Sequence, residues 1–300
     1  MHLKEEYAFI TILFFGAFLG FSDGSCVLPW AGVWYDSAFP DNDVTFDNSS
    51  QSVLGWKIQA YSTEGTNWVC LEESQVDNKL LFRSLTNFGI FSIPIFMFRC
   101  IRWTKISDDA YLYYVLADEQ TNIANQRLYA EASDTNLTIE TACSATNPPE
   151  TNEFHVIVRK GRESSARQNC PSLLLHNFTY IHDNGTMTSC DPANGSADGC
   201  SNRQQIEFDF SQCNTAVGFS AGGVYYCLHS ETVGPVQYAL TITPESVDYQ
   251  KTFKFTCFVL QQSGSYIYAS DTKGSCKRTQ SPFSKETDGT GFLKLLSFGK

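Results

Sequence analysis

Phe96-Met97-Phe98-Arg99-Cys100 and Phe253-Lys254-Phe255-Thr256-Cys257 are two copies of one F-x-F-x-C pattern, placed 157 residues apart. Thirty residues before each of these cysteines stands another, Cys70 and Cys227, next to similar aromatic and apolar residues. The repeated spacing indicates a tandem duplication. We therefore expect two consecutive domains of the same kind.

Strand patterns dominate both halves. In residues 205–210, Ile206, Phe208 and Phe210 alternate with polar residues, and residues 238–243 alternate in the same way, which predicts strands with one buried face and one wet face. Residues 111–116, 154–158 and 252–260 are further aromatic and β-branched segments. We expect an all-β protein of two tandem, disulfide-stabilised antiparallel β domains, each a barrel or a sandwich. Short helices are expected only over residues 117–131 and in the tail.

The domain limits follow from composition. An apolar run over residues 9–21 ends at Ser22-Asp23-Gly24-Ser25, which predicts a signal peptide over residues 1–24, cleaved after Ser22 or Gly24. Thirteen residues of helix are too short to cross a membrane. A polar stretch with Pro148-Pro149 separates the two halves. The predicted units are the signal peptide, a first domain over 25–147, a second over 148–282 and a tail over 283–300.

Two other apolar segments need an interpretation. Residues 89–98 contain Pro94 and end at Arg99-Cys100, so we interpret them as a buried strand rather than a membrane span. The apolar part of the tail is too short for a span or for a glycolipid-anchor signal. We expect a secreted, extracellular chain with no membrane span after cleavage.

Five N-x-S/T acceptor sequences agree with that location. A glycan cannot be buried, so each predicts a surface position. The predicted glycosylation sites are Asn48, Asn136, Asn177, Asn184 and Asn194. Asn177 lies in an apolar context that is also compatible with the core.

The eleven cysteines predict a disulfide framework. Aligning the copies matches Cys26, Cys70, Cys100 and Cys143 with Cys170, Cys227, Cys257 and Cys276 in that order. Equivalent positions should pair alike, although spacing alone does not determine the pairing. We predict that each copy joins its first cysteine to its last and its middle two to each other. The predicted bonds are Cys26–Cys143, Cys70–Cys100, Cys170–Cys276, Cys227–Cys257 and, in the second copy alone, Cys190–Cys200, with Cys213 as the free thiol.

No cofactor or metal site is expected. The cysteines form no C-x-x-C pair, and the five histidines are not grouped at zinc-finger spacing. Asp41, Asp43 and Asp47 lie close together in sequence, but they lack the glycine and the terminal glutamate of an EF-hand loop. We interpret them as a solvated acidic loop.

The G-x-S-x-G sequence at residues 218–222 resembles the nucleophile elbow of serine hydrolases. An elbow leads into a helix, whereas residues 223–227 here read as a strand. His229 is the only downstream histidine, and no carboxylate lies between Ser220 and His229. The sequence therefore favours a structural turn, and no catalytic residue is predicted.

A shorter motif suggests a carrier. Gly32-Val33-Trp34 resembles the G-x-W motif of the first lipocalin strand, and Asp109-Ala110-Tyr111 resembles their T-D-Y motif. The resemblance implies a barrel that holds a small apolar ligand, with Trp34 closing its base. The other interpretation is a glycine turn between two core tryptophans, Trp30 and Trp34.

A wider resemblance covers nearly the whole chain. Residues 26–35, 98–103, 208–213, 226–228 and 255–258 resemble an uncharacterised family of secreted, multi-domain, cysteine-rich proteins of invertebrates. The resemblance implies an extracellular location and disulfide bonds, and it carries no active residues.

These observations predict a non-enzymatic, glycosylated extracellular protein that acts by binding or in an extracellular assembly. A net charge of −11 disfavours nucleic acid and anionic membranes as partners. The partner is expected to be an extracellular protein or a matrix component. The alternatives are a lipocalin-like carrier and an acidic component of a mineralised or cuticular matrix.

Overall fold

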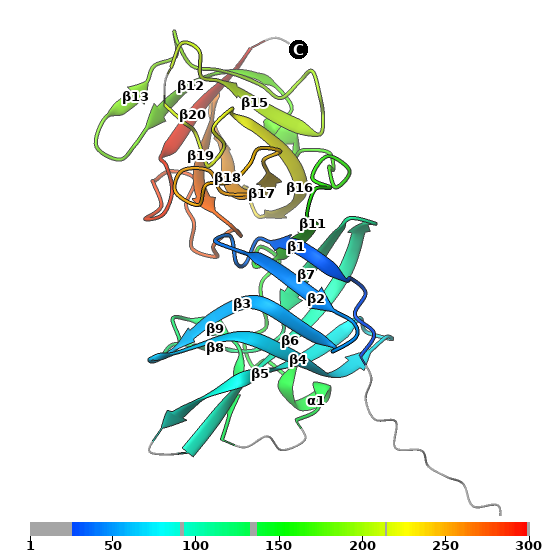
Figure 1. The fold of residues 1–300 in the computed structure, drawn as a ribbon. Coiled ribbons are helices and arrows are strands. Elements are labelled where there is room, and N and C mark those ends of the chain that lie inside the picture. Colours follow the sequence, from blue (N-terminus) through cyan, green and yellow to red (C-terminus); the bar gives the residue numbers. More distant parts are fainter. Residues whose placement is uncertain (1–25, 91–92, 133–136, 214, 299–300) are drawn as a thin grey trace, which may run out of the picture.

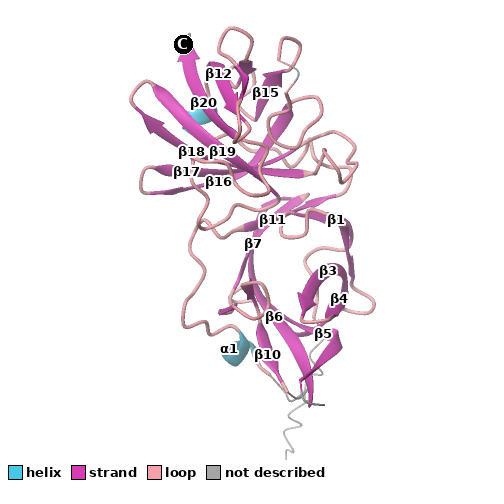
Figure 2. Cartoon of the chain, turned by 90° about the vertical axis from the view of Figure 1, so that its left-hand side faces the viewer, coloured by secondary structure: helices cyan, strands magenta, loops and turns pink. Residues whose placement is uncertain are grey.

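A computed structural model describes residues 26–90, 93–132, 137–213 and 215–298 of the 300-residue chain. The predicted signal peptide lies outside the described residues. The fold is all-β, and two eight-stranded antiparallel barrels lie one above the other in Figure 1. Figure 2 shows that strands make up both barrels and that α1 (Ile139–Ala142) is a short helix. The predicted fold class is confirmed.

The first barrel is an up-and-down meander. Its strands pair in the order β6-β5-β4-β3-β2-β1-β11-β7, and pairing of β7 with β6 closes it. Neighbouring strands of the ring follow each other directly in the chain from β1 to β7, and residues 116–154 lie between β7 and β11. The strands are β1 (Gly32–Asp36), β2 (Asp43–Asp47), β3 (Ser52–Ala60), β4 (Thr63–Ser74), β5 (Lys79–Ile90), β6 (Ile93–Ser107), β7 (Ala110–Val115) and β11 (His155–Arg159). Three short strands lie outside the closed ring: β8 (Glu119–Gln120), β9 (Gln126–Arg127) and β10 (Tyr129–Glu131).

The second barrel has the same topology. Its strands pair in the order β12-β14-β15-β16-β17-β18-β19-β20, and β20 closes the ring on β12. The strands are β12 (Asn177–Asp183), β14 (Ser196–Asp198), β15 (Gln205–Asp209), β16 (Val224–Val233), β17 (Val236–Ile242), β18 (Phe255–Ser263), β19 (Tyr266–Lys273) and β20 (Phe292–Phe298). A 3-10 turn, Ser172–Leu174, precedes β12, and β13 (Thr188–Cys190) is an additional strand paired with it.

The duplication extends to local irregularities. In the first barrel the register of β4 against β5 shifts between Cys70 and Glu72. In the second barrel the register of β16 against β17 shifts between Cys227 and His229. This position is 157 residues after the first shift, which is the offset between the two copies. A β-bulge re-aims side chains locally and raises the twist of the strand. Both copies therefore have the bulge immediately after the equivalent cysteine.

The core of the first barrel is aromatic. Trp34, Trp56, Trp68 and Phe82 are fully buried, and Trp56 contacts Phe82 edge to face at 5.0 Å between ring centroids. Aromatic pairs of this kind add to the stabilisation from burial alone. Trp34 lies in the core with the Arg159 guanidinium 4.6 Å from its ring centroid. The barrel interior is thus filled largely by rings.

The two barrels share a third apolar core where their outer sheet faces meet. Strands β1, β7 and β11 contribute to it from the first barrel and β16, β17 and β18 from the second. Fully buried members include Val156, Val158, Leu240, Ile242, Phe255 and Val259. A strand covered on both faces needs apolar residues at successive positions. This explains why Phe255–Leu260 is buried without a break instead of alternating.

Two predicted domain limits and one predicted helix need correction. Strand β11 pairs with β1 and β7, so the first domain continues to Arg159 and does not end at residue 147. The predicted tail over 283–300 is not separate in its described part, because β20 (Phe292–Phe298) is the closing strand of the second barrel. The predicted helix over 117–131 is wrong, since this segment forms β8, β9 and β10. Pairing between distant strands determines both domain limits, and local periodicity does not reveal such pairing.

The disulfide bonds pair differently from the prediction. The observed bonds are Cys26–Cys70, Cys100–Cys143, Cys170–Cys227, Cys257–Cys276 and Cys190–Cys213. The predicted bonds Cys26–Cys143, Cys70–Cys100, Cys170–Cys276, Cys227–Cys257 and Cys190–Cys200 are all wrong. Equivalent positions do pair alike in the two copies, but each copy joins its first cysteine to its second and its third to its fourth.

Strand order explains the error. Cys70 is on β4 and Cys100 on β6, and β5 lies between them. Two strands separated by a third are about 9–10 Å apart, whereas a disulfide needs Cα atoms within about 7 Å. The same obstacle, β17, separates Cys227 from Cys257. Each cysteine instead bonds to one in a loop, as Cys100 does to Cys143 across a Cα separation of 5.3 Å.

The free thiol is Cys200 and not Cys213. Cys190 and Cys213 are both buried, whereas Cys200 is exposed on a turn whose backbone N–H donates to Asp198 at 2.8 Å. We expect native protein to incorporate one equivalent of iodoacetamide, at Cys200, without prior reduction. Peptide mass spectrometry would check this, and labelling at Cys213 or at no cysteine would contradict the assignment.

Candidate functional site

A polar pocket of about 740 Å³ lies between the barrels. From the first barrel it is lined by the β1–β2 loop, the segment after β7 and the start of β11. In an up-and-down barrel these connections all fall at one end, so the pocket is at the mouth of the first barrel. From the second barrel it is lined by residues 273–279 and Asp288 of the β19–β20 connection. The volume is within the range of small-molecule sites.

Ser275 joins the two halves of the pocket. Its backbone N–H donates to the Ser37 carbonyl at 2.8 Å, and the two hydroxyl oxygens are 2.8 Å apart. The same hydroxyl is 2.7 Å from Nδ1 of His155. The adjacent Cys276 is bonded to Cys257 on β18. A loop of the second barrel is therefore fixed over the mouth of the first.

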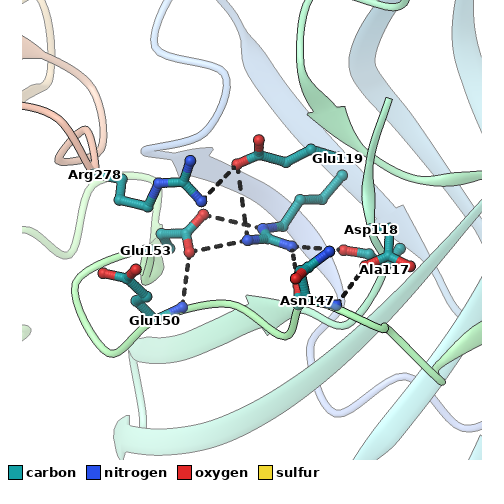
Figure 3. Close-up of polar contacts among 8 residues, drawn as sticks. Ala117, Asp118, Glu119, Asn147, Glu150, Glu153 and Arg278 are labelled. Carbon is teal, nitrogen blue, oxygen red and sulfur yellow. Dashed lines mark hydrogen bonds and ion pairs between the residues drawn. The ribbon is translucent and has the colours of Figure 1, made fainter. Parts of the chain in front are cut away.

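Ion pairs hold the rim of the pocket. Arg127 bonds Glu153 through Nε and Nη2, both at 3.0 Å, and donates Nη1 to the carbonyls of Ala117 and Asn147. Arg278 reaches across from the second barrel to Glu119 at 3.4 Å, as Figure 3 shows. These contacts tie the long segment between β7 and β11 to both barrels.

Asp36 is the last residue of β1, directly before Ser37 of the pocket wall, and it is buried. Its carboxylate accepts hydrogen bonds from the Trp56 indole at 2.8 Å, from the Tyr113 hydroxyl at 2.9 and 3.0 Å and from the Ala38 backbone at 2.9 Å. Burial raises the pKa of Asp36, while the Arg99 charge and these donors oppose that shift. Burial also raises the pKa of Tyr113, with a further contribution from the Asp36 charge.

Arg99 is the buried cation of the site. Its side chain is on β6 and lines the pocket, yet Arg99 is only 2% exposed. The guanidinium carbon is 5.0 Å from the ring centroids of both Phe39 and Trp56. Stacking on aromatic faces stabilises a guanidinium and leaves its N–H edge available for hydrogen bonds.

His155 is the third titratable group. Its ring centroid is 5.0 Å from that of Tyr113, and its Nδ1 shares a hydrogen bond with the Ser275 hydroxyl. Burial, together with the positive charges of Arg99 and Arg127, lowers its pKa to about 3. The imidazole is therefore neutral at physiological pH and adds no charge to the pocket.

The serine of the G-x-S-x-G motif at residues 218–222 is buried. Ser220 is 1% exposed, and in the described chain its hydroxyl bonds to Thr243 at 3.2 Å rather than to a histidine. His229 is elsewhere and bonds Glu231 at 2.8 Å. The Tyr225 hydroxyl fixes the turn by donating to the Val217 carbonyl and accepting from the Ser220 N–H. The interpretation of this motif as a structural turn fits the observed contacts.

The three clustered aspartates of the first domain have separate partners. Asp41 pairs with Lys273 at 2.8 Å, Asp43 pairs with Lys160 at 2.5 Å, and Asp47 accepts from Ser49 and Ser50 in its own loop. Within the described ranges, no three His, Cys, Asp or Glu side chains are grouped so that they could hold a metal ion.

The acceptor asparagines differ in accessibility. Asn48 and Asn194 are exposed and Asn184 is partly exposed, whereas Asn136 lies outside the described residues. Asn177 is half-buried on β12, and its Oδ1 is enclosed without a hydrogen-bond partner in the described chain. Glycosylation at these positions stays a prediction.

Sequence reasoning missed the pocket residues. Arg99 is part of the F-x-F-x-C phrase that revealed the duplication, and in the other copy Thr256 stands in its place. A charged residue at one of two matched core positions was an available signal. No such signal in the sequence marked Asp36 and His155, because their roles depend on contacts between distant segments.

A comparison with known protein families gives a match in the second barrel. Residues 166–290 match a family model described as a domain of unknown function (DUF7042). The match runs from just before Cys170 to just before β20, and it agrees with the expected resemblance to an uncharacterised family. No curated protein and no solved structure matches the chain. The described chain also contains no helix of the length and hydropathy that a membrane crossing requires.

Proposed function

We propose that this chain is a secreted, N-glycosylated binding protein that holds a small polar ligand in the pocket between its barrels. The observation that carries the proposal is Arg99, a buried cation lining a pocket of about 740 Å³ with most of its donors unused. Burying donors without acceptors is costly, so such groups persist where they meet a ligand or ordered water.

Secretion is supported by the covalent framework. Five disulfide bonds join ten of the eleven cysteines, and bonds of this kind persist in oxidising compartments. The exposed acceptor residues Asn48 and Asn194 agree with the same location. Binding rather than catalysis is favoured because the acidic side chains of the pocket are engaged in ion pairs with its cations.

A carrier of apolar ligands is the second candidate. The first barrel has the up-and-down, eight-stranded topology of lipocalins, and Trp34 of the G-x-W motif is buried in its core. Against this candidate, Trp56, Trp68 and Phe82 occupy the interior where such a ligand would lie. A fluorescent fatty acid is therefore expected not to bind at one equivalent, and stoichiometric binding would favour the carrier. The acidic matrix component stays a prediction.

Ligand-observed NMR with the full chain tests the proposal. A library of small polar molecules is screened against wild type and against Thr279→Trp, which places an indole at the exposed rim of the pocket. We expect hits at wild type that weaken at least about tenfold in Thr279→Trp, because the indole occupies ligand volume. The matched control is Thr188→Trp on β13, an exposed position of the second barrel. Hits that bind both variants equally, or no hits at all, would rule out the pocket.

A further inference from the structure

We infer that the ligand of this pocket is a small organic monocarboxylate whose carboxylate is held by Arg99. This rests on the proposed function, which says only that a polar ligand binds there. The inference follows from the charges around the pocket, the unused donors of Arg99 and the shape of a guanidinium.

The charges lining the pocket cancel, with one exception. Asp41 pairs with Lys273, Glu153 with Arg127, Asp288 with Lys277 and Glu119 with Arg278, at distances of 2.6 to 3.4 Å. Of the described charged residues that line the pocket, Arg99 is the one without an ion-pair partner within 4 Å. A ligand therefore meets one cation that has no direct ion pair, rather than a general positive field.

Asp36 does not form a direct ion pair with Arg99. Its two carboxylate oxygens are already occupied by donors from Trp56, Tyr113 and Ala38. The Arg99 charge acts on Asp36 through space and lowers its pKa against the effect of burial. No direct contact between the two side chains competes with a ligand for the N–H groups of the guanidinium.

The donors of Arg99 are nearly all unused. Its single hydrogen bond within the described chain is from Nη2 to the Tyr113 hydroxyl at 3.5 Å, and Nε has no partner. A guanidinium presents five N–H donors in a planar fork, and a carboxylate accepts two of them side by side. Stacking on Phe39 and Trp56 fixes the plane of this fork.

The surroundings favour one negative charge over two. Asp36, Glu119, Glu153, Asp41 and Asp288 all lie in or beside the pocket, and a phosphate dianion would be repelled by them after the one free cation is satisfied. Ala38, Pro40 and Val115 add apolar surface beside the charged groups. The site thus fits a carboxylate attached to a small apolar body.

Isothermal titration calorimetry of the full chain with a matched ligand pair tests the inference. Benzoate and benzamide have the same shape, but only benzoate carries the charge. We expect benzoate to bind at least about tenfold more tightly than benzamide and than inorganic phosphate. Arg99→Lys, which keeps the charge but not the fork, is expected to weaken benzoate binding by about tenfold or more. Arg102→Met, on the same strand outside the pocket, is the control and should bind like wild type.

The outcomes separate the inference from the function on which it rests. Equal binding of benzoate and benzamide, or tighter binding of phosphate, overturns the monocarboxylate while a polar-ligand pocket stands. Hits in the NMR library that are all uncharged overturn it in the same way. If nothing in the library and none of the three probes binds wild type, both proposals fail. The comparison of benzoate with benzamide uses wild-type protein, so it remains decisive even if Arg99→Lys does not fold.

Discussion

Asp36→Ala is expected to lower the free energy of unfolding of the first barrel by about 3 to 5 kcal/mol, because each buried donor left without an acceptor costs about 1 to 3 kcal/mol and a charge that acts on Arg99 through space is also lost. The substitution leaves the Arg99 guanidinium buried without an opposing charge. It also removes the acceptor of the Trp56 indole and of the Tyr113 hydroxyl, which lie at 2.8 and 2.9 Å. Trp56 and Tyr113 are at most 1% exposed, so water does not replace the lost acceptor.

Urea unfolding followed by tryptophan fluorescence measures this effect. All five tryptophans lie between residues 30 and 103, so the signal reports the first barrel alone. Asp77→Ala, on the exposed β4–β5 turn, is the matched control and should change stability little. Asp36→Asn keeps the shape of the side chain and one acceptor oxygen. Its loss of stability should lie between those of Asp36→Ala and Asp77→Ala. A change below about 1 kcal/mol for Asp36→Ala would show that Arg99 does not depend on this carboxylate.

Patterns within one strand or one repeat were readable from the sequence. The alternation of Ile206, Phe208 and Phe210 predicted β15, and these residues do follow the inside–outside period, with Ile206 and Phe208 buried. The matched cysteines predicted that both copies would pair alike, which they do. What failed was the pairing itself, because it depends on which strand lies between Cys70 and Cys100. Two different connectivities satisfy the same repeat, and only the sheet order distinguishes them.

The pocket could not be predicted, for a related reason. Its walls come from segments far apart in sequence, as the contact between Ser37 and Ser275, 238 positions apart, shows. The near-continuous apolar runs of β11 and β18 did carry a signal that both strand faces are covered. In a duplicated chain this pattern indicates that the two copies pack on each other. The docking of the barrels then brings the β19–β20 connection over the mouth of the first barrel.

Acidification is expected to destabilise the first barrel through His155. Burial and the charges of Arg99 and Arg127 hold its pKa at about 3, against 6.5 for an unperturbed histidine. As the pH falls below 6.5, His155 binds a proton in the unfolded chain but not in the folded chain. The free energy of unfolding therefore decreases progressively until about pH 3. Between pH 7 and pH 4 the loss is at most about 3 kcal/mol, since each pH unit contributes up to about 1.4 kcal/mol and water in the pocket reduces this.

His155→Gln separates this contribution from the others. Asp271, whose pKa burial raises to about 6, acts in the opposite direction, because its folded form binds a proton more tightly than the unfolded chain does and gains stability below that pH. The informative quantity is therefore the difference between wild type and His155→Gln at each pH. We expect this difference to change steadily from pH 6.5 to pH 4 and to be flat above pH 7. His176→Gln, on the second barrel next to Phe178, is the matched histidine substitution outside the pocket. If His155→Gln follows the same pH dependence as wild type, the imidazole is not held neutral by Arg99 and Arg127, and the buried positive charge at the pocket is weaker than its geometry indicates.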